Sequence, residues 1–279
     1  MTRIPAEQPQ GLILFQSFYN PTDPERRNEI DSCLNKNLAN PAVRQLVLYL
    51  DHGRVEYPKH PKILPRCLND REITFAHAFA EALNWRNRIC MLINNDIFLD
   101  KDSFADLTEI NKLCDEDYVV CLSRHEYDPF TNTARMDERF SKLLFAHTQD
   151  AWIWKANFIP PNADFPVGIL GCDNAINERL RRAGKMPINL ASKYKIYHFD
   201  AARQKTSGNF LQKKFRQEIR ESYPEEQGQF LTPEFHMAMR SSLDDLAKRL
   251  GLTQLERYEL ICDMISKKIK ISNRKRDST

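Results

Sequence analysis

Glycine is scarce in this chain of 279 residues, which contains only eight. Neither the spacing GxGxxG nor the spacing GxxxxGK followed by Ser or Thr occurs. These two patterns mark the dinucleotide-binding Rossmann turn and the P-loop, so the sequence supports neither site. Any phosphate that this protein binds must be held by something other than a glycine-rich loop.

Paired cysteines and long apolar runs are missing as well. The seven cysteines are an odd number and show no CxxC spacing, which predicts free thiols in a reducing compartment. No apolar run approaches the ~20 residues that span a bilayer. The segment Met1–Gln10 is polar and interrupted by proline, unlike a secretory signal. Together these features predict a cytoplasmic protein.

The basic charge is concentrated at one end. The chain has 41 Lys and Arg against 38 Asp and Glu, a net charge of +3. Residues 267–279 hold six of the basic residues and one acidic residue, which leaves the rest of the chain at −2. A nucleic-acid-binding domain would carry a broad basic surface. We therefore expect no nucleic-acid partner.

Hydrophobic periodicity predicts an α/β fold with a mostly parallel sheet flanked by helices. Short apolar runs alternate with segments of helical period over the first two hundred residues, and only helical period remains after about Arg203. We expect one domain over 1–204 and a helical C-terminal appendage over 205–279. The expected strands are 11–18, 43–50, 89–93, 118–122, 151–154 and 188–198. Helices are expected after Asp23, with Asp70 as N-cap, around 104–110 and over 174–183, and loops over 52–69 and 125–147.

Polar residues follow the expected strands where each one ends. Residues 16–18 end the first strand, Asp51 follows the second, residues 94–96 follow the third and Arg124 follows the fourth. In an open α/β sheet the ligand binds at the carboxyl ends of the strands. We therefore expect these side chains to face one crevice.

Asp96 and His198 are candidates for binding a divalent cation. Asp96 offers a hard oxygen ligand directly after a buried strand, and His198 ends the last extended segment and offers a nitrogen. An oxygen ligand suits Mg²⁺ or Mn²⁺, and a nitrogen ligand favours Mn²⁺. An Asn-Asn-Asp cluster after a strand is also ordinary turn chemistry, so this interpretation remains open.

Asp173 and the tryptophans upstream of it each permit two interpretations. Asp173 precedes a helix, so it either caps the first turn or acts as a general base for an acceptor hydroxyl. Trp152 and Trp154 either stack on sugar rings or fill the core. Local sequence does not choose between these alternatives.

Taken together, these segments resemble GT-A glycosyltransferases, and more narrowly a compact branch related to the family-2 enzymes that occurs in bacteria and large viruses. The resemblance covers about Gly11 to Arg203. It is carried by six segments in order: Gln-Ser-Phe (16–18), Asn-Asn-Asp-Ile-Phe (94–98), Leu-Ser-Arg (122–124), Thr-Gln-Asp-Ala-Trp-Ile-Trp (148–154), Gly-Cys-Asp-Asn (171–174) and Tyr-His-Phe (197–199).

The resemblance implies an enzyme that transfers a sugar from a nucleoside-diphosphate donor to an acceptor hydroxyl, with inversion. The Asp-x-Asp motif of such enzymes maps onto Asn94, Asn95 and Asp96, so here only Asp96 is an anionic metal ligand. His198 corresponds to the histidine that completes the metal shell, and Asp173 to the catalytic base. The implied metal is a divalent cation, Mn²⁺ more than Mg²⁺.

The remaining implied roles concern donor and acceptor, the latter a glycan or a lipid-linked sugar. Residues implied to bind the nucleotide sugar are Ser17, Phe18, Asp51, Arg71, Asn94, Asn95 and Arg124. Those implied to bind the acceptor are Gln149, Asp150 and Trp152.

Three other functions compete with this hypothesis. A sugar nucleotidyltransferase would use a similar fold but needs a glycine-rich phosphate loop, which residues 16–22 do not provide. A glycoside hydrolase needs two facing carboxylates, for which Asp150 and Asp173 are the candidates. A nucleotide-sugar-binding module without activity would explain Asn94 in place of an aspartate.

The C-terminal segment predicts amphipathic helices with two interpretations. Leu243, Leu246, Leu250 and Ile261 belong to apolar faces that would pack on the first domain or on a second copy of the chain. The basic residues after position 266 would instead draw the protein to an anionic membrane, at ~1 kcal/mol per basic residue. We expect peripheral membrane contact or a homodimer from this segment.

Overall fold

The computed structural model describes residues 11–50, 55–68, 72–129, 131–135, 149–168, 172–191 and 193–199. The expected helical appendage lies outside these ranges, as do Asp51 and Arg71. Within the part described, no helix is both long and apolar enough to cross a membrane.

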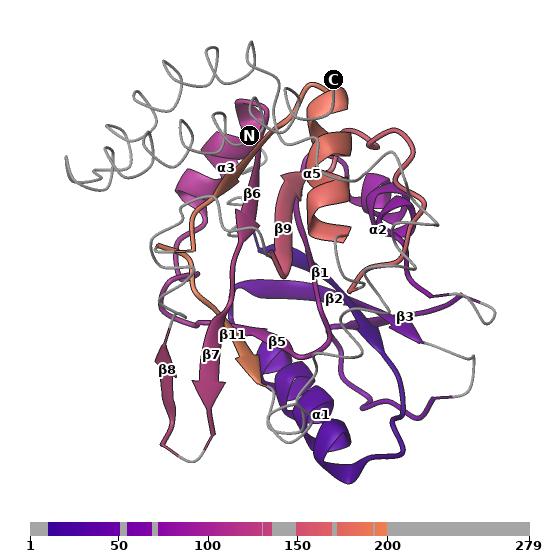
Figure 1. The fold of residues 1–279 in the computed structure, drawn as a ribbon, viewed down its shortest axis with the longest axis vertical. Coiled ribbons are helices and arrows are strands. Elements are labelled where there is room, and N and C mark those ends of the chain that lie inside the picture. Colours follow the sequence, from indigo (N-terminus) through magenta and orange to yellow (C-terminus); the bar gives the residue numbers. More distant parts are fainter. Residues whose placement is uncertain are drawn as a thin grey trace, which may run out of the picture.

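The described residues form a seven-stranded central sheet. Its strands lie in the order β10 (Met186–Asn189), β6 (Tyr118–Leu122), β9 (Ala151–Lys155), β4 (Ile89–Ile93), β1 (Leu12–Phe18), β2 (Val43–Leu50) and β3 (Ile63–Cys67) (Figure 1). All neighbours pair in parallel except β9, which is antiparallel to both β4 and β6. Six strands therefore share one carboxyl edge, and the expected mostly parallel α/β sheet is confirmed.

Both faces of this sheet are covered by helices. Along β1, Leu12 and Leu14 pack on one side and Ile13 and Phe15 on the other, because successive side chains point to opposite faces. Helices α1 (Pro24–Ala39) and α3 (Thr108–Asp115) bury the first side, and α2 (Phe75–Ala82) and α5 (Cys172–Arg182) bury the second. Burial on both faces explains why β4 is a continuous apolar run and β1 is apolar from Leu12 to Phe15.

A second sheet of four strands packs beside the first and brings distant polar residues together. It runs β5 (Ile97–Leu99), β11 (Ile196–Phe199), β7 (His125–Asp128) and β8 (Thr133–Arg135) (Figure 1). Strand β11 pairs antiparallel to β5 and parallel to β7, so His198 lies opposite both Ile97 and Glu126. This register places His198 next to Asp96, which directly precedes β5.

Several expected elements are corrected by the structure. The expected loops 52–69 and 125–147 contain β3 and the β7–β8 hairpin, and the expected strand 188–198 is divided between β10 and β11 in different sheets. These strands and β5 have three to five residues each. Strands this short are stabilised by pairing with distant segments, which a local pattern does not reveal.

Helix boundaries agree with the sequence in some places and not in others. Asp23 caps α1 by accepting a hydrogen bond from the Glu25 amide at 2.9 Å, as expected. Helix α2 begins after Thr74 rather than Asp70, because the Thr74 hydroxyl and the His77 side chain form a reciprocal capping box. Helix α3 begins at Thr108, four residues beyond Phe104, which is buried in the core.

Six cysteines of the described residues have free thiols, and all are buried except Cys67, which is exposed at the end of β3.

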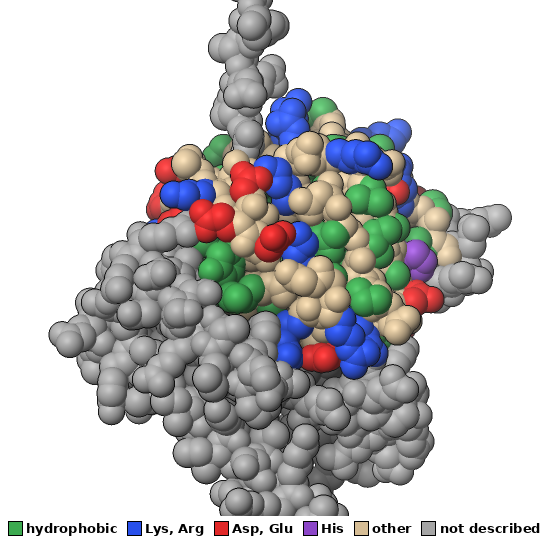
Figure 2. Space-filling view, turned by 90° about the horizontal axis from the view of Figure 1, so that it is seen from above, with side chains coloured by type: hydrophobic (Ala, Val, Ile, Leu, Met, Phe, Trp, Pro, Cys, Tyr) green, Lys and Arg blue, Asp and Glu red, His purple; other side chains and the backbone are tan. Residues whose placement is uncertain are grey.

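On the face shown in Figure 2, Lys and Arg side chains lie among Asp and Glu side chains and apolar ones. That face carries charges of both signs and not one continuous basic surface.

Asn37 fastens helix α1 to the strand that follows Asp96. Its Nδ2 donates to the Ile97 carbonyl at 2.9 Å and to Gln16 Oε1 at 3.3 Å, and its Oδ1 accepts from the Leu99 amide at 3.0 Å. The side chain is completely buried. The bonds to Ile97 and Leu99 hold β5, and with it Asp96, against α1, and the bond to Gln16 connects α1 to β1.

Replacing Asn37 with Ala is expected to lower the free energy of unfolding by about 2–4 kcal/mol, because it leaves buried polar groups without partners. Urea unfolding of the full chain measures this change. Asn35→Ala is the matched control, since Asn35 is exposed on the same helix, and it should change the free energy by less than about 0.5 kcal/mol. Equal effects of both substitutions would contradict the role given to Asn37.

Candidate functional site

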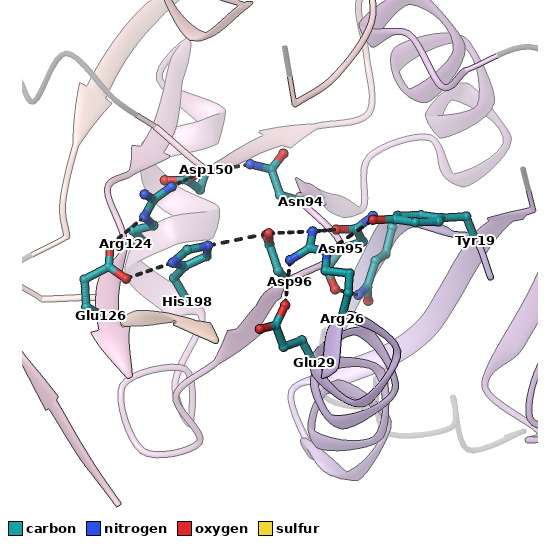
Figure 3. A network of polar contacts seen from close by, with 11 residues as sticks. Tyr19, Arg26, Glu29, Asn94, Asn95, Asp96, Arg124, Glu126, Asp150 and His198 are labelled. Carbon is teal, nitrogen blue, oxygen red and sulfur yellow. Dashed lines mark hydrogen bonds and ion pairs between the residues drawn. The ribbon is translucent and has the colours of Figure 1, made fainter. Parts of the chain in front are cut away.

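Polar side chains from several elements meet at the carboxyl edge of the central sheet. Strand β4 ends at Ile93 and is followed by Asn94, Asn95 and Asp96, while antiparallel β9 enters the same edge directly after Asp150. Figure 3 shows these side chains beside those of α1, β7 and β11. The expected convergence at this edge is therefore found for residues 94–96 and Arg124, and Asp150 and His198 lie with them.

Asp96 is the centre of the network. Its Oδ2 accepts a hydrogen bond from Arg26 Nη2 at 2.9 Å and lies 3.5 Å from His198 Nε2. His198 Nδ1 in turn lies 2.8 Å from Glu126 Oε2. The side chains of Asp96 and His198 are 7% and 1% exposed, so these charges interact away from bulk water.

The electrostatics of this centre follow from its charge pairing. Burial alone would raise the pKa of Asp96, but the hydrogen bonds and charges of His198 and Arg26 outweigh it and hold that pKa well below its usual range. Burial would lower the pKa of His198, yet Asp96 and Glu126 raise it to about 9. Burial also opposes ionisation of Glu126, but His198 and Arg124 lower its pKa to about 2. Asp96 and Glu126 are therefore carboxylates at neutral pH.

A chain of ion pairs continues from Glu126 to the start of β9. Arg124 Nε donates to Glu126 Oε1 at 2.9 Å, and Arg124 Nη1 donates to Asp150 Oδ1 at 3.1 Å. Asn94 Nδ2 donates to the same Asp150 oxygen at 2.9 Å. Asp150 thus lies between Arg124 and Asn94, and both donate to it (Figure 3).

Two oxygens of this pair have no hydrogen-bond donor within the described part of the chain. They are Asn94 Oδ1 and Asp150 Oδ2, and both atoms are buried. A Cβ on Gly168 would lie 3.8 Å from Asn94 Oδ1, which places this glycine, with φ of +85°, beside the pair. A buried acceptor without a donor is costly, so these oxygens are suited to accept hydroxyl groups of a ligand.

Asp173 lies in the first turn of α5 and is 8% exposed. Asn177, one turn later, donates to Gln149 Oε1 at 2.6 Å, which fastens this helix to the residue before Asp150. Burial raises the pKa of the neighbouring Cys172, and the charges of Asp173 and Asp150 both raise it further. The bond between Asn177 and Gln149 therefore brings α5, on which Asp173 lies, close to Asp150.

The structure places the other expected site residues unevenly. Ser17 is half-buried at the end of β1, and Asn95 Oδ1 accepts from Arg26 Nη2 at 3.1 Å. Phe18 and Trp152 have no exposed surface and lie in the two core clusters, where Trp152 packs edge-on against Phe75 at 4.8 Å between ring centres. Neither ring is available to a ligand. The structure therefore corrects the expected role of Phe18 in donor binding and that of Trp152 in acceptor binding.

Sequence reasoning missed Arg26, Glu29, Tyr19 and Glu126. Arg26 Nε donates to the Tyr19 hydroxyl at 3.2 Å, and its Nη1 donates to Glu29 Oε2 at 2.9 Å. The i,i+3 spacing of Arg26 and Glu29 on a predicted helix was the one local signal that could have indicated a pair. Glu126 enters the site only because β7 pairs with β11, which local sequence does not show.

The residues present fit a divalent cation through two side chains. Among the described residues no group of three His, Cys, Asp or Glu side chains is arranged to hold a metal ion. Asp96 Oδ2 and His198 Nε2 nevertheless lie 3.5 Å apart. Two ligands at about 2.1 Å from one ion are about 3.0–3.4 Å apart in octahedral or tetrahedral geometry. Glu126 on the far nitrogen of His198 is the partner that typically orients a metal-binding histidine.

Comparison by sequence finds no related protein. No known protein family matches the chain, and no curated protein matches it.

Comparison by structure identifies the fold. The chain is similar to a mannosyltransferase, PcManGT from Pyrobaculum calidifontis, whose structure holds GDP-Man and Mn²⁺, with a TM-score of 0.53 and 13% sequence identity over 95% of this chain and 87% of that one. It also matches TarS of S. aureus with a TM-score of 0.42 and 10% identity, over 84% of this chain and 43% of that one. The first similarity shows that the chain has a GT-A-type glycosyltransferase fold, as the sequence resemblance implies.

Proposed function

We propose that the protein is a glycosyltransferase that moves a sugar from a nucleoside-diphosphate donor to an acceptor hydroxyl with inversion of configuration. The observation that carries this proposal is the buried pair of Asp96 and His198, with 3.5 Å between Oδ2 and Nε2, at the carboxyl edge of a GT-A-type sheet. Support also comes from PcManGT, which has this fold and binds GDP-Man and Mn²⁺. Fold alone does not define activity, so the side chains at this edge carry the argument.

Asp96 and His198 would hold the divalent cation. A cation bound there supplies a Lewis acid that stabilises charge on the departing diphosphate. The nitrogen of His198 favours Mn²⁺ over Mg²⁺, which prefers oxygen ligands. Glu126 keeps the His198 ring in place through Nδ1.

The donor is proposed to lie across the strand ends beside this pair. Ser17 and Asn95 lie at the ends of β1 and β4, and Arg124, which pairs with Glu126 and Asp150, supplies a guanidinium group at the same edge. Asp51 and Arg71 remain proposed donor-binding residues from the sequence, since they lie outside the described residues.

Asp150, Asn94 and Gln149 are proposed to bind sugar hydroxyls. Asp150 Oδ2 and Asn94 Oδ1 are buried acceptor oxygens without donors among the described residues, and adjacent hydroxyl groups of a sugar are donors of matching kind. Gln149 holds its place through Asn177. The acceptor is proposed to be a glycan or a lipid-linked sugar.

Asp173 is proposed as the general base that takes the proton from the acceptor hydroxyl. It lies at the start of α5, the helix that Asn177 connects to Gln149, the residue before Asp150. The acceptor oxygen then attacks the anomeric carbon as the bond to the diphosphate breaks, and the proton passes to the Asp173 carboxylate. Attack on the face opposite the leaving group inverts the configuration.

The test is a screen of the full chain with UDP-, GDP- and dTDP-sugars in the presence of Mn²⁺. We expect release of nucleoside diphosphate from one class of donor, and loss of this release when EDTA removes the metal. Tight binding of a donor without release would instead favour a nucleotide-sugar-binding module. Neither binding nor release with any donor would contradict the proposed function.

A further inference from the structure

Arg26 already places a positive charge on the oxygen that would bind the metal. Its Nη2 donates to Asp96 Oδ2 at 2.9 Å, and this is the same oxygen that lies 3.5 Å from His198 Nε2. The Arg26 side chain is 14% exposed, so the pair is largely shielded from water. Figure 3 shows the guanidinium between Asp96 and helix α1.

The guanidinium is held by four partners from three parts of the chain. Besides Asp96, it donates to Glu29 Oε2 at 2.9 Å, to Asn95 Oδ1 at 3.1 Å and to the Tyr19 hydroxyl at 3.2 Å. Burial lowers the pKa of Arg26, but Asp96, Tyr19 and Glu29 raise it to a net value above the usual one. The guanidinium is therefore a fixed, fully charged cation in this protein.

The charge balance of the network leaves room for more positive charge. Among the contacts described, four carboxylates stand against two guanidinium groups and the His198 ring, whose pKa of about 9 keeps it protonated at neutral pH; the carboxylates are those of Glu29, Asp96, Glu126 and Asp150, and the guanidinium groups are those of Arg26 and Arg124. This excess of negative charge attracts a further cation. The obstacle is local, because Arg26 donates to Asp96 Oδ2, the oxygen that a metal would use.

A metal ion and Arg26 cannot share this oxygen without cost. An ion about 2.1 Å from Oδ2 would lie within about 5 Å of the guanidinium, whose nitrogen is 2.9 Å from the same atom. Like charges at this distance repel strongly in a poorly solvated site. This repulsion is reduced either when Arg26 moves toward Glu29 or when an anion binds between the two cations.

We propose that Arg26 occupies Asp96 in the ligand-free protein and yields it to a divalent cation when a diphosphate enters, because the diphosphate gives the guanidinium a new anionic partner. This inference rests on the proposed function and names how donor and metal binding are coupled. Metal and nucleoside diphosphate then bind cooperatively, each raising the affinity for the other by the same factor. Arg26 is a positioning residue that keeps metal affinity low until the donor is present.

The test measures the Kd for Mn²⁺ from the EPR signal of the free ion, with the full chain alone and with UDP, GDP or dTDP in separate titrations. Arg26→Gln removes the charge but keeps a side chain of similar reach. In the absence of nucleotide it is expected to bind Mn²⁺ at least about tenfold more tightly than wild type, since one like charge beside the ion is gone. The effect of the nucleotide on the Kd for Mn²⁺ is expected to be smaller in this variant than in wild type.

Arg27→Gln is the matched control. Arg27 is the next residue on α1 and pairs with Asp31 at 2.7 Å, outside the network. This variant is expected to bind Mn²⁺ like wild type. An equal gain in both variants would show a general charge effect and would overturn the role of Arg26.

The outcomes separate this inference from the proposed function. The inference is overturned when Arg26→Gln binds Mn²⁺ with the affinity of wild type or more weakly. It is also overturned when no diphosphate changes the Kd of wild type for Mn²⁺, and this second measurement does not depend on the folding of a variant. When wild type still releases diphosphate from a sugar nucleotide, only the role of Arg26 fails. When wild type binds neither Mn²⁺ nor any diphosphate, the proposed function fails with it.

Discussion

Replacing Asp173 with Asn is expected to lower kcat for sugar transfer by about 10²–10⁴-fold, because the amide cannot accept the proton of the acceptor hydroxyl. The KM for the donor should stay close to that of wild type, since Asp173 acts on the acceptor. Steady-state rates of diphosphate release, measured at varied donor and acceptor concentrations, give both constants.

Glu178→Gln is the matched control for this substitution. Glu178 lies on the same helix and pairs with Arg181 and Arg182. Its loss should leave kcat within about twofold of wild type, as for surface ion pairs of small energy. A rate near wild type in Asp173→Asn would show that this carboxylate is not the base.

Replacing Asp96 with Asn is expected to weaken Mn²⁺-dependent donor binding by at least about 100-fold. The change removes the anionic ligand of the proposed cation, and even loss of a residue that only orients a ligand costs about 10–100-fold in metal affinity. It also leaves Arg26 without its closest carboxylate outside α1. Calorimetric titration of the donor with and without Mn²⁺ measures the effect.

Asp102→Asn serves as the control for Asp96, because Asp102 is exposed six residues further along the chain. Donor binding by this variant should equal that of wild type in both conditions. If Mn²⁺ changes donor binding equally in Asp96→Asn and in wild type, Asp96 is not a ligand of the metal.

The central sheet was predictable because the local sequence pattern of most of its strands is that of a buried strand. β4 and β6 are continuous apolar runs and β1 and β2 are largely apolar, as burial on both faces requires, and Asp23 with Pro24 marks the start of α1. The position of Asp96 followed from the end of β4 alone. Residues at the carboxyl ends of parallel strands meet at one edge, so this part of the site needed no knowledge of distant contacts.

The second sheet and the residues that it positions were not predictable in this way. β5 has three residues and β11 has four, and their pairing is what brings His198 to Asp96 and Glu126 to His198. His198 was a candidate ligand because it ends the last extended segment, and a family pattern supports it, while Glu126 had no such signal. Arg26 is one of many polar residues on α1, so its contacts with the β4–β5 turn became visible only in the folded chain.

Trp152 shows a further limit of local sequence. Trp152 and Trp154 point to the same face of β9, and that face is covered by α2 and α5. A tryptophan next to polar Gln149 and Asp150 could equally stand in a sugar site. Only the helix packing against the sheet decides that the ring lies in the core.

The most direct measurement of the central claim is anomalous diffraction at the manganese edge from crystals of the full chain grown with Mn²⁺ and a nucleoside diphosphate. The account predicts one strong anomalous peak bonded to both Asp96 Oδ2 and His198 Nε2, with phosphate oxygens completing the shell. A peak bonded to other residues, or a bound diphosphate without manganese at this pair, would contradict it.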